Sequence, residues 1–426
     1  MDERQARKVL EQGLSKADLL GRRVLVLTPD GTRSGPMPML FRLFAETLRP
    51  RVAKLDFLIA LGTHQPLSEA AQNRLFGVSA AERAGKYAGI SIHNHHWERP
   101  ETFTRIGTIA AGEIEELSGG LMRQDVPVAL NRLIRDYDHL ILYGPVFPHE
   151  VAGFSGGHKY FFPGIAGAEI INFTHWLGAL ITNFRIIGRR DTPVRAVIER
   201  AAAMVEKSAT GVCSVVEGDG LTDLFVGPVA EAWRQAAARA AETHIRWVEK
   251  PYSLVIAVMP EMYDDLWTGA KGMYKMEPAV AEGGEVIIFA PHIREVSYTH
   301  GKILDEIDYH VRDYFLKQWD RFQHYPGGVL AHSTHLKGMG RFADGVEEPR
   351  VKVTLATGIP RERCAKLAVG YRDPKQLRLA EFEGREQEGI LVVHRAGEIL
   401  YRLNSQRDLN ETNGRGTACR APTPGH

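Results

Sequence analysis

Short apolar runs rich in Val, Ile and Leu alternate with segments of helical period along most of this chain. Five of the runs have the length and the continuous hydrophobic character of strands that are buried on both faces. They are residues 23–27, 55–60, 139–143, 254–259 and 285–289. Strands that alternate with helices form mostly parallel sheets with right-handed crossovers. We therefore predict an α/β fold.

Helices are predicted between these runs, at residues 38–47, 69–75, 126–135, 193–205 and in an alanine-rich stretch at 229–247. The pattern begins afresh at residues 254–259, and 426 residues are too many for one ordinary core. We predict two domains, 1–248 and 249–403, each with a mostly parallel sheet flanked by helices, and an active site in the cleft between them. Residues 404–426 are polar and rich in Gly and Pro, which predicts a disordered tail.

The charge balance favours a small ligand. The 53 Lys and Arg residues oppose 52 Asp and Glu residues, and this net charge of +1 gives no reason to expect a nucleic acid or an acidic membrane as partner. Cys213, Cys364 and Cys419 are scattered without a CxxC pair, which predicts neither a disulfide framework nor a thiolate metal site and suits a reducing cytoplasm. No apolar run approaches the length of a membrane span, so we expect no export and no membrane insertion.

The segment from His149 to Gly164 concentrates chemically active groups. It holds one amine, Lys159, two imidazoles and four glycines, and His175 follows sixteen residues after the lysine. Glycines let the backbone approach a ligand closely, so Lys159 could be a nucleophile, an anion clamp or a tether. It is not part of a phosphate-binding loop, because His158 stands where that motif needs Gly and no Ser or Thr follows the lysine. No G-x-G-x-x-G opens a helix after the first strand either.

Other polar residues follow the carboxyl ends of the predicted strands, where open α/β sheets bind ligands. They are Asp30, Arg33, Thr63, His64 and His149. A guanidinium at such a position suits a carboxylate or a phosphate, and the alternative is an ordinary turn with a solvent-facing arginine.

Three histidines lie within residues 93–96, and this density favours proton transfer or metal binding. In a strand, His93 and His95 would share one face. Lys271 lies near a predicted helix start, where the helix dipole disfavours a cation, so a functional role is favoured over a solvated surface lysine. His332 and His335 lie near a glycine turn and have no assigned role.

Together these segments resemble the lactate racemase family of nickel-dependent 2-hydroxyacid racemases and epimerases. The matching pieces occur in the order Asp30-Gly-Thr32-Arg33, Leu61-Gly-Thr-His64, Asn94-His95, His149, Gly153-Phe-Ser-Gly-Gly-His-Lys159, Pro163-Gly164, His175 and the Lys271 segment. They extend over most of the chain. The spacing of His149, Lys159 and His175 is the most specific part.

The resemblance implies a nickel pincer nucleotide as cofactor, supplied by cofactor-synthesis enzymes. Lys159 would then form its covalent thioamide tether, and His175 would be the protein ligand to nickel. Asp30 and Thr32 would support the cofactor or Arg33. Such a cofactor would carry the difficult chemistry, because removing a hydride from C2 of a 2-hydroxy acid gives a neutral ketone, whereas removing a proton leaves charge beside the carboxylate.

For the substrate, a small 2-hydroxy acid, the resemblance implies four residues. His95 and His149 would flank it as acid/bases, and Arg33 and Lys271 would hold its carboxylate and its reacting oxygen. Lactate racemase has a tyrosine-glutamine pair where this chain has Trp267 and Thr268. A changed pocket changes specificity, so we expect a substrate larger than lactate, such as a longer 2-hydroxy acid or an aldonate epimerised at C2.

Two alternatives remain at this point. A zinc or iron hydrolase would use His93, His95, His149 and His175 as metal ligands and would leave Lys159 without a distinctive role. A non-enzymatic protein could bind an organic anion through Arg33, Lys159 and Lys271, which explains the cations but not the histidines.

Overall fold

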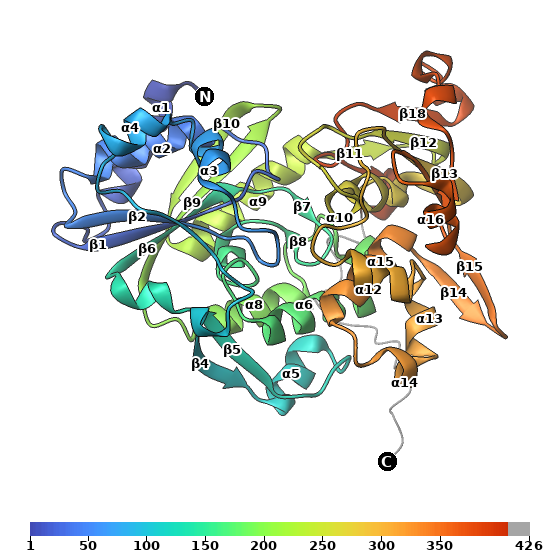
Figure 1. Cartoon of the computed structure of the whole chain (residues 1–426), viewed down its shortest axis with the longest axis horizontal. Coiled ribbons are helices and arrows are strands. Elements are labelled where there is room, and N and C mark those ends of the chain that lie inside the picture. The colour runs from blue at the N-terminus through green and yellow to red at the C-terminus, as the bar shows by residue number, and fades with distance from the viewer. Residues whose placement is uncertain (408–426) are drawn as a thin grey trace.

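The computed structural model describes residues 1–407, which form two main sheets with helices around them (Figure 1). The first sheet has the strand order β10-β9-β6-β1-β2-β3, and only β10 runs antiparallel to its neighbour. Its strands are β1 (Arg23–Thr28), β2 (Lys54–Ile59), β3 (Ile92–Asn94), β6 (His139–Pro145), β9 (Ser208–Glu217) and β10 (Gly220–Gly227).

Helices cover both faces of this sheet because its strands are apolar on both sides. Val24 and Val26 of β1 pack in one core with helices α1, α2 and α3, whereas Leu25 and Leu27 pack in another with α6 and α8. The helices of this part are α1 (Glu3–Leu14), α2 (Met37–Leu48), α3 (Glu69–Phe76), α4 (Ala80–Ala84), α5 (Ala111–Ser118), α6 (Ala168–Ile181), α7 (Asn183–Ile186), α8 (Pro193–Ala202) and α9 (Val229–His244).

The second sheet is wholly parallel, with the order β17-β16-β13-β12-β18. Its strands are β12 (Tyr252–Val258), β13 (Val280–Ala290), β16 (Lys352–Thr357), β17 (Gly370–Tyr371) and β18 (Ile390–Val393). The helices around it are α10 (Leu266–Gly269), α11 (Lys271–Tyr274), α12 (Gly301–Ile307), α13 (Arg312–Leu316), α14 (Trp319–Phe322), α15 (Gly327–Lys337) and α16 (Arg361–Lys366).

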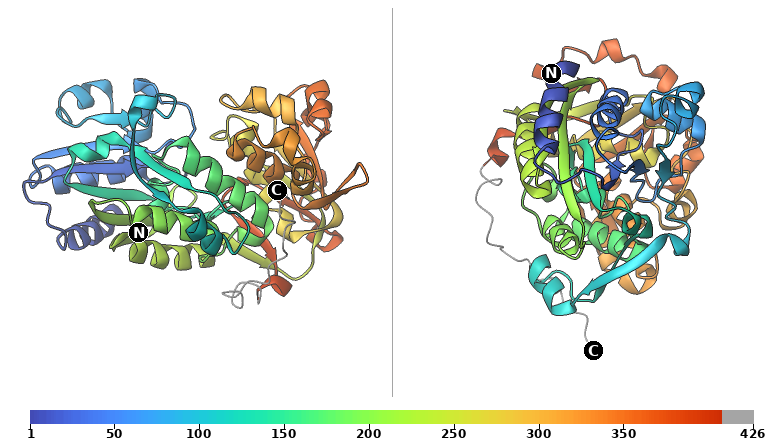
Figure 2. Two further views of the ribbon diagram at one scale, coloured as in Figure 1. Left: turned by 90° about the horizontal axis from the view of Figure 1, so that it is seen from below. Right: turned by 90° about the vertical axis from the view of Figure 1, so that its left-hand side faces the viewer.

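Small two-stranded units complete the fold, and α15 packs against α6 between the two sheets (Figure 2). The units are β4 (Phe103–Ile109) with β5 (Val126–Asn131), β7 (Pro148–His149) with β8 (Gly153–Phe154), β14 (Gly340–Ala343) with β15 (Val346–Pro349), and β11 (Ile245–Val248) with β19 (Leu400–Leu403). In the last pair, strands from before and after the second sheet run side by side.

The predicted α/β class with mostly parallel sheets is confirmed. The helix predicted at 126–135 is wrong: these residues form strand β5 and a short 3-10 helix, because Val126, Val128 and Leu130 are buried with the period of two that a strand produces. The helix predicted at 229–247 ends at His244, and β11 follows it.

The predicted boundary at residue 248 remains a prediction. Of the predicted tail, residues 404–406 form a short 3-10 helix, and Gln406 donates a hydrogen bond to the carbonyl of Pro278 at 2.9 Å. The remainder of that prediction, from residue 408 onward, lies outside the described residues. Within residues 1–407, no helix combines the length and the apolar character that a bilayer span requires.

Candidate active site

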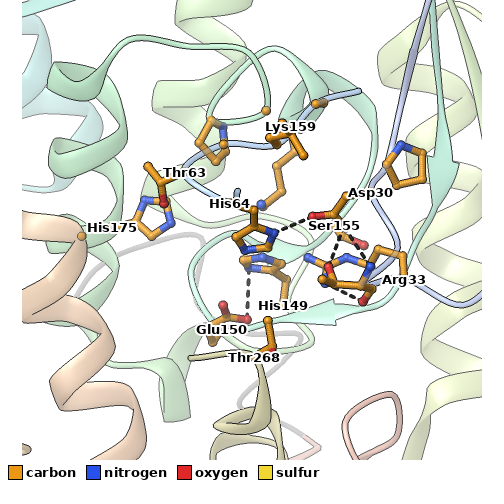
Figure 3. A pocket seen from close by; sticks show the side chains of 18 of the residues that line it. Asp30, Arg33, Thr63, His64, His149, Glu150, Ser155, Lys159, His175 and Thr268 are labelled. Atoms are coloured by element: carbon orange, nitrogen blue, oxygen red, sulfur yellow. Dashed lines mark hydrogen bonds and ion pairs between the residues drawn. The ribbon is translucent and has the colours of Figure 1, made fainter. Parts of the chain in front are cut away.

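A cavity of about 150 Å³ collects loops from the first sheet and helices beside the second (Figure 3). The loops that follow β1, β2 and β6 contribute from one side, and α10, α11 and α15 from the other. Seven of the eight predicted site residues line it: Asp30, Thr32, Arg33, His149, Lys159, His175 and Lys271. The parallel strands bring Asp30, Thr32 and Arg33 to one edge of the first sheet, whereas His175 comes from α6 and Lys271 from α11.

His95 does not line this cavity. It follows the last residue of β3, is fully buried, and places its Nδ1 3.1 Å from the side-chain nitrogen of Asn131. Its ring meets Phe103 edge-on at 5.5 Å. The acid/base role predicted for His95 therefore has no support from its position.

The ligand set of the alternative hydrolase is not assembled either. His93 approaches Asp56 at 4.0 Å, and neither it nor His95 lines the cavity with His149 and His175. Among residues 1–407, no three His, Cys, Asp or Glu side chains are grouped in a way that could hold a metal ion.

His64 lines the cavity in place of His95. Its Nδ1 lies 2.5 Å from Oδ2 of Asp30, and Asp30 also accepts hydrogen bonds from the backbone N–H and the hydroxyl of Thr32 at 3.0 and 2.7 Å. Burial alone raises the pKa of Asp30, but His64, Arg33 and Thr32 together hold it well below its ordinary value. The ionised carboxylate thus keeps a proton on Nδ1 of His64 and leaves Nε2 as a base.

His149, in β7, is held by the backbone that follows it. Its Nδ1 accepts a hydrogen bond from the N–H of Val151 at 3.1 Å, so Nε2 is the nitrogen available for other contacts. Burial lowers the pKa of His149 well below its ordinary value. Glu150, which sequence reasoning missed, also lines the cavity and lies 3.4 Å from Nδ1, where its carboxylate can stabilise a protonated ring.

Lys159 reaches the cavity from a loop that only glycine can form. Gly156 and Gly157 have φ angles of 81° and 61°, in the left-handed region. The surrounding protein desolvates the amine, and this burial, with the charge of Arg33 as the next cause, lowers the pKa of Lys159 to about 7. A large share of the amine is therefore unprotonated and nucleophilic near neutral pH.

This shift predicts an unusual reactivity of Lys159 in cofactor-free protein. Because the amine loses its proton near pH 7 rather than near 10.5, its acylation rate should rise between about pH 6 and 8 and then level off. The measurement is mass spectrometry of peptides after brief treatment with an acylating reagent at each pH. Lys159→Met protein gives the background of the remaining lysines. A rate for Lys159 that still climbs near pH 10 would contradict the prediction.

His175 projects from α6 with one nitrogen already committed. Its Nδ1 donates to the carbonyl of Ile171 at 2.7 Å, which leaves Nε2 with a free electron pair. Burial lowers the pKa of His175 to about 4, so the ring is neutral at pH 7. A neutral imidazole whose other N–H is tied to a carbonyl is the usual form of a metal-ligating histidine.

Two further cations line the cavity. Lys271, at the start of α11, is 9% exposed, and its amine lies 4.1 Å from the ring centre of Tyr263. Burial, and then Arg33, lower the pKa of Lys271 well below its ordinary value. Arg33 lies close enough to Asp30 and Glu150 for both to favour its charged form. This pair suits a carboxylate and a neighbouring oxygen.

The two residues expected to alter specificity differ in their surroundings. The hydroxyl of Thr268 donates to Asp265 at the start of α10, at 2.9 Å to Oδ1, so it is occupied by a helix cap. The indole of Trp267 stacks on His332, with ring centres 4.1 Å apart and an angle of 5° between the rings. His332 and His335 of α15 both line the cavity, although no role could be assigned to them from the sequence.

Comparison with known proteins points to one family. Residues 6–185 match the family model described as the lactate racemase N-terminal domain. Lactate racemase of Thermoanaerobacterium thermosaccharolyticum is 25% identical over 280 residues, which are 63% of this chain and 60% of that protein. Lactate racemase of Lactiplantibacillus plantarum is 26% identical over 168 residues, or 38% of this chain and 35% of that protein. The matches thus span less than two thirds of these relatives.

Solved structures extend the likeness over the whole fold. A crystal structure of a protein from Thermotoga maritima aligns with a TM-score of 0.85 and 29% identity, over 95% of this chain and 98% of that one. The lactate racemase apoprotein from Thermoanaerobacterium thermosaccharolyticum aligns with a TM-score of 0.70 and 19% identity, over 94% of this chain and 93% of that one. This second likeness shows a common fold.

Proposed function

We propose that this chain is a racemase or epimerase that inverts C2 of a 2-hydroxy acid, and the match of residues 6–185 to the lactate racemase N-terminal domain supports this proposal. The observation that carries the proposal is the convergence of Lys159, His175, His64 and His149 on one cavity. An amine, a metal-type imidazole and two acid/base imidazoles are the groups that such a reaction needs.

The cofactor that we propose is a nickel pincer nucleotide, attached covalently to Lys159 and with its nickel bound by His175. The residues fit this group: the Lys159 amine has a lowered pKa that favours covalent attachment, and His175 offers a free Nε2. When bound, the group supplies a reversible hydride acceptor for C2. Asp30 bonds to His64 and Thr32 bonds to Asp30, so we assign both to the orientation of His64 and not to the cofactor.

For proton transfer we propose His64 and His149, with His64 taking the role that the sequence assigned to His95. His64 accepts the hydroxyl proton at Nε2 while Asp30 holds its Nδ1–H. Because Nδ1 accepts from Val151, the neutral ring of His149 carries its proton on Nε2; to pass that proton on, Nδ1 must take up a proton and turn from Val151 to Glu150. Arg33 and Lys271 bind the carboxylate and the reacting oxygen of the substrate.

For the substrate we propose a monocarboxylate larger than lactate, with an aldonate as the first choice. The cavity adjoins a cleft of about 760 Å³ that shares His64, Trp267 and Thr268 with it, so a longer acid has room. Polar groups such as His332, His335 and Thr63 line these walls and suit hydroxyl groups. Glu150 disfavours a second carboxylate.

Hydride transfer makes a clear prediction for an acid deuterated at C2. Its configuration should invert in ordinary water while the label stays on carbon, because the hydrogen leaves and returns as hydride and does not mix with solvent protons. Mass spectrometry of the separated epimers measures the retained label. The reverse experiment, an unlabelled acid in heavy water, should introduce no deuterium at C2. Rapid washout of the label would point to proton abstraction instead.

The identity of the acid is open to a direct screen of loaded protein against 2-hydroxy acids and sugar acids. Binding without inversion would support the non-enzymatic alternative, in which Arg33, Lys159 and Lys271 hold an anion. We also propose that cofactor-synthesis enzymes load this chain and that it acts in the cytoplasm, where its buried thiols Cys213 and Cys364 stay reduced.

A further inference from the structure

The loop that leads to Lys159 is held by two side chains outside the cavity lining. Three successive carbonyls of this loop each accept a hydrogen bond from a helix that packs on the sheet. Arg195 of α8 donates to the carbonyl of Phe154 at 2.5 Å and to that of Gly156 at 3.4 Å. Trp233 of α9 donates from its indole N–H to the carbonyl of Ser155, between them, at 2.9 Å.

Arg195 and Trp233 form one unit, which we call the loop clamp. The guanidinium lies 4.0 Å from the ring centre of Trp233, and both residues are 3% exposed. The loop is pressed against them: a Cβ atom at Gly157 would come within 2.9 Å of the Trp233 side chain. The carbonyl of Gly156 also accepts the N–H of Lys159 at 3.3 Å, and the clamp adds its own hydrogen bonds to this and the two preceding buried carbonyls.

The clamp also reaches the residue before the lysine. Glu199, one turn after Arg195 on α8, lies 3.7 Å from the guanidinium, and its carboxylate is 2.6 Å from Nδ1 of His158. α8 thus binds backbone carbonyls before Gly157 and the side chain of His158 after it. Lys159 follows at once and projects into the cavity from a loop with little freedom to move.

A contribution to the stability of the fold does not by itself explain the pairing of Arg195 with Trp233. Arg195 is a buried cation whose Nε has no hydrogen-bond partner among residues 1–407, and its nearest carboxylate is at the outer limit of an ion pair. A buried charge with incomplete partners costs free energy, and an apolar side chain of similar size is often the more stable choice. The clamp therefore needs a reason other than packing.

We propose that Arg195 and Trp233 are positioning residues for Lys159, which hold its amine desolvated in the cavity at the place where the cofactor is attached. Attachment itself rests on the function proposed above, whereas the effect on the amine does not. The positive charge of Arg195 acts in the same direction, since it disfavours a second cation at Lys159.

The test compares two changes that remove hydrogen bonds but keep size. Arg195→Met deletes both contacts to the loop, and Trp233→Phe deletes the indole N–H while it keeps an aromatic ring beside the guanidinium. In cofactor-free protein at neutral pH, both should lower the acylation rate of Lys159 by about tenfold, because a resolvated amine is mostly protonated. Arg195→Lys keeps a charge but cannot bridge two carbonyls, so it should rescue only part of the rate.

Arg200→Met is the matched control, because Arg200 lies on the same helix and pairs with Glu113, away from the loop. Each variant is also produced together with cofactor-making enzymes, and the covalent adduct is counted by intact mass. We expect a lower adduct fraction in both clamp variants and none of these effects in Arg200→Met.

If Arg195 and Trp233 only stabilise the fold, the clamp variants should melt at a lower temperature. At temperatures below the transition, where the variants are folded, the reactivity of Lys159 should then equal that of the wild type. Unchanged or faster acylation in folded Arg195→Met and Trp233→Phe therefore overturns the proposal. If acylation falls as expected but wild-type protein never acquires an adduct, the positioning role stands and the proposed cofactor is refuted.

Discussion

Replacing Lys159 by alanine is expected to abolish the covalent adduct and to lower interconversion of the substrate epimers by at least about 10⁴-fold, because the group that carries the difficult step is lost with its anchor. Intact mass of protein produced with the cofactor-making enzymes should show a mass increment in the wild type and none in Lys159→Ala. Nickel content should fall in parallel. The loop around Lys159 should stay folded, since Arg195 and Trp233 bind its carbonyls and not the amine.

Lys271→Ala is the natural comparison, because Lys271 is a second cation of the same cavity. Lys271→Ala should lose activity but keep the adduct and the nickel, since the role that we propose for Lys271 is to hold the substrate. An adduct that persists in Lys159→Ala would refute the tether. Stoichiometric zinc that is indifferent to the lysine change would revive the hydrolase.

The second large effect is expected at His64 and His149. Replacing either by asparagine should lower the interconversion rate by about 10²–10⁴-fold, the usual contribution of general acid–base catalysis, while the adduct stays in place. Asp30→Asn should weaken the reaction through His64, because the neutral amide cannot hold the proton on Nδ1 as the carboxylate does. The measurements are epimerisation rates and intact mass on the same preparations.

His95 provides the contrast that decides between the two histidines. It is fully buried against Asn131 and Phe103, so His95→Gln should lower the melting temperature and leave the rate per folded molecule nearly unchanged. The assignment of His64 fails if His64→Asn remains fully active. Loss of activity in His95→Gln without loss of stability would restore the role that the sequence gave to His95.

The sequence was sufficient for most of the first sheet because its strands are continuous apolar runs, which admit few other interpretations. The sequence predicted the wrong element at residues 126–135. The apolar residues Val126, Val128 and Leu130 can be fitted to the period of a helix or of a strand, and pairing with β4 makes this segment a strand. The sequence also overextended α9, since nothing local marks His244 as the end. There the pairing of β11 with a strand more than 150 residues later determines the structure.

For the site, position after a strand singled out Asp30, Arg33 and His149, and the other predicted residues came from the glycine-rich segment and the family resemblance; seven of the eight line the cavity. The sequence favoured His95, whereas His64 lines the cavity, and both histidines follow neighbouring parallel strands. Only the path of the next loop decides which ring enters the cavity. The sequence did not single out Glu150 and gave His332 and His335 no role, because their place in the cavity depends on contact between segments that are distant in the chain.

Lys159, His175, His64 and His149, to which we assign the chemistry, lie before residue 248, whereas the cavity residues Trp267, His332 and His335 lie after it. Substitutions after residue 248 can therefore change the preferred substrate during evolution, while the residues before it keep the type of reaction. A chimera that exchanges residues 262–337 between two relatives should accordingly carry substrate preference with the exchanged segment. The type of reaction should remain that of the protein that receives the segment.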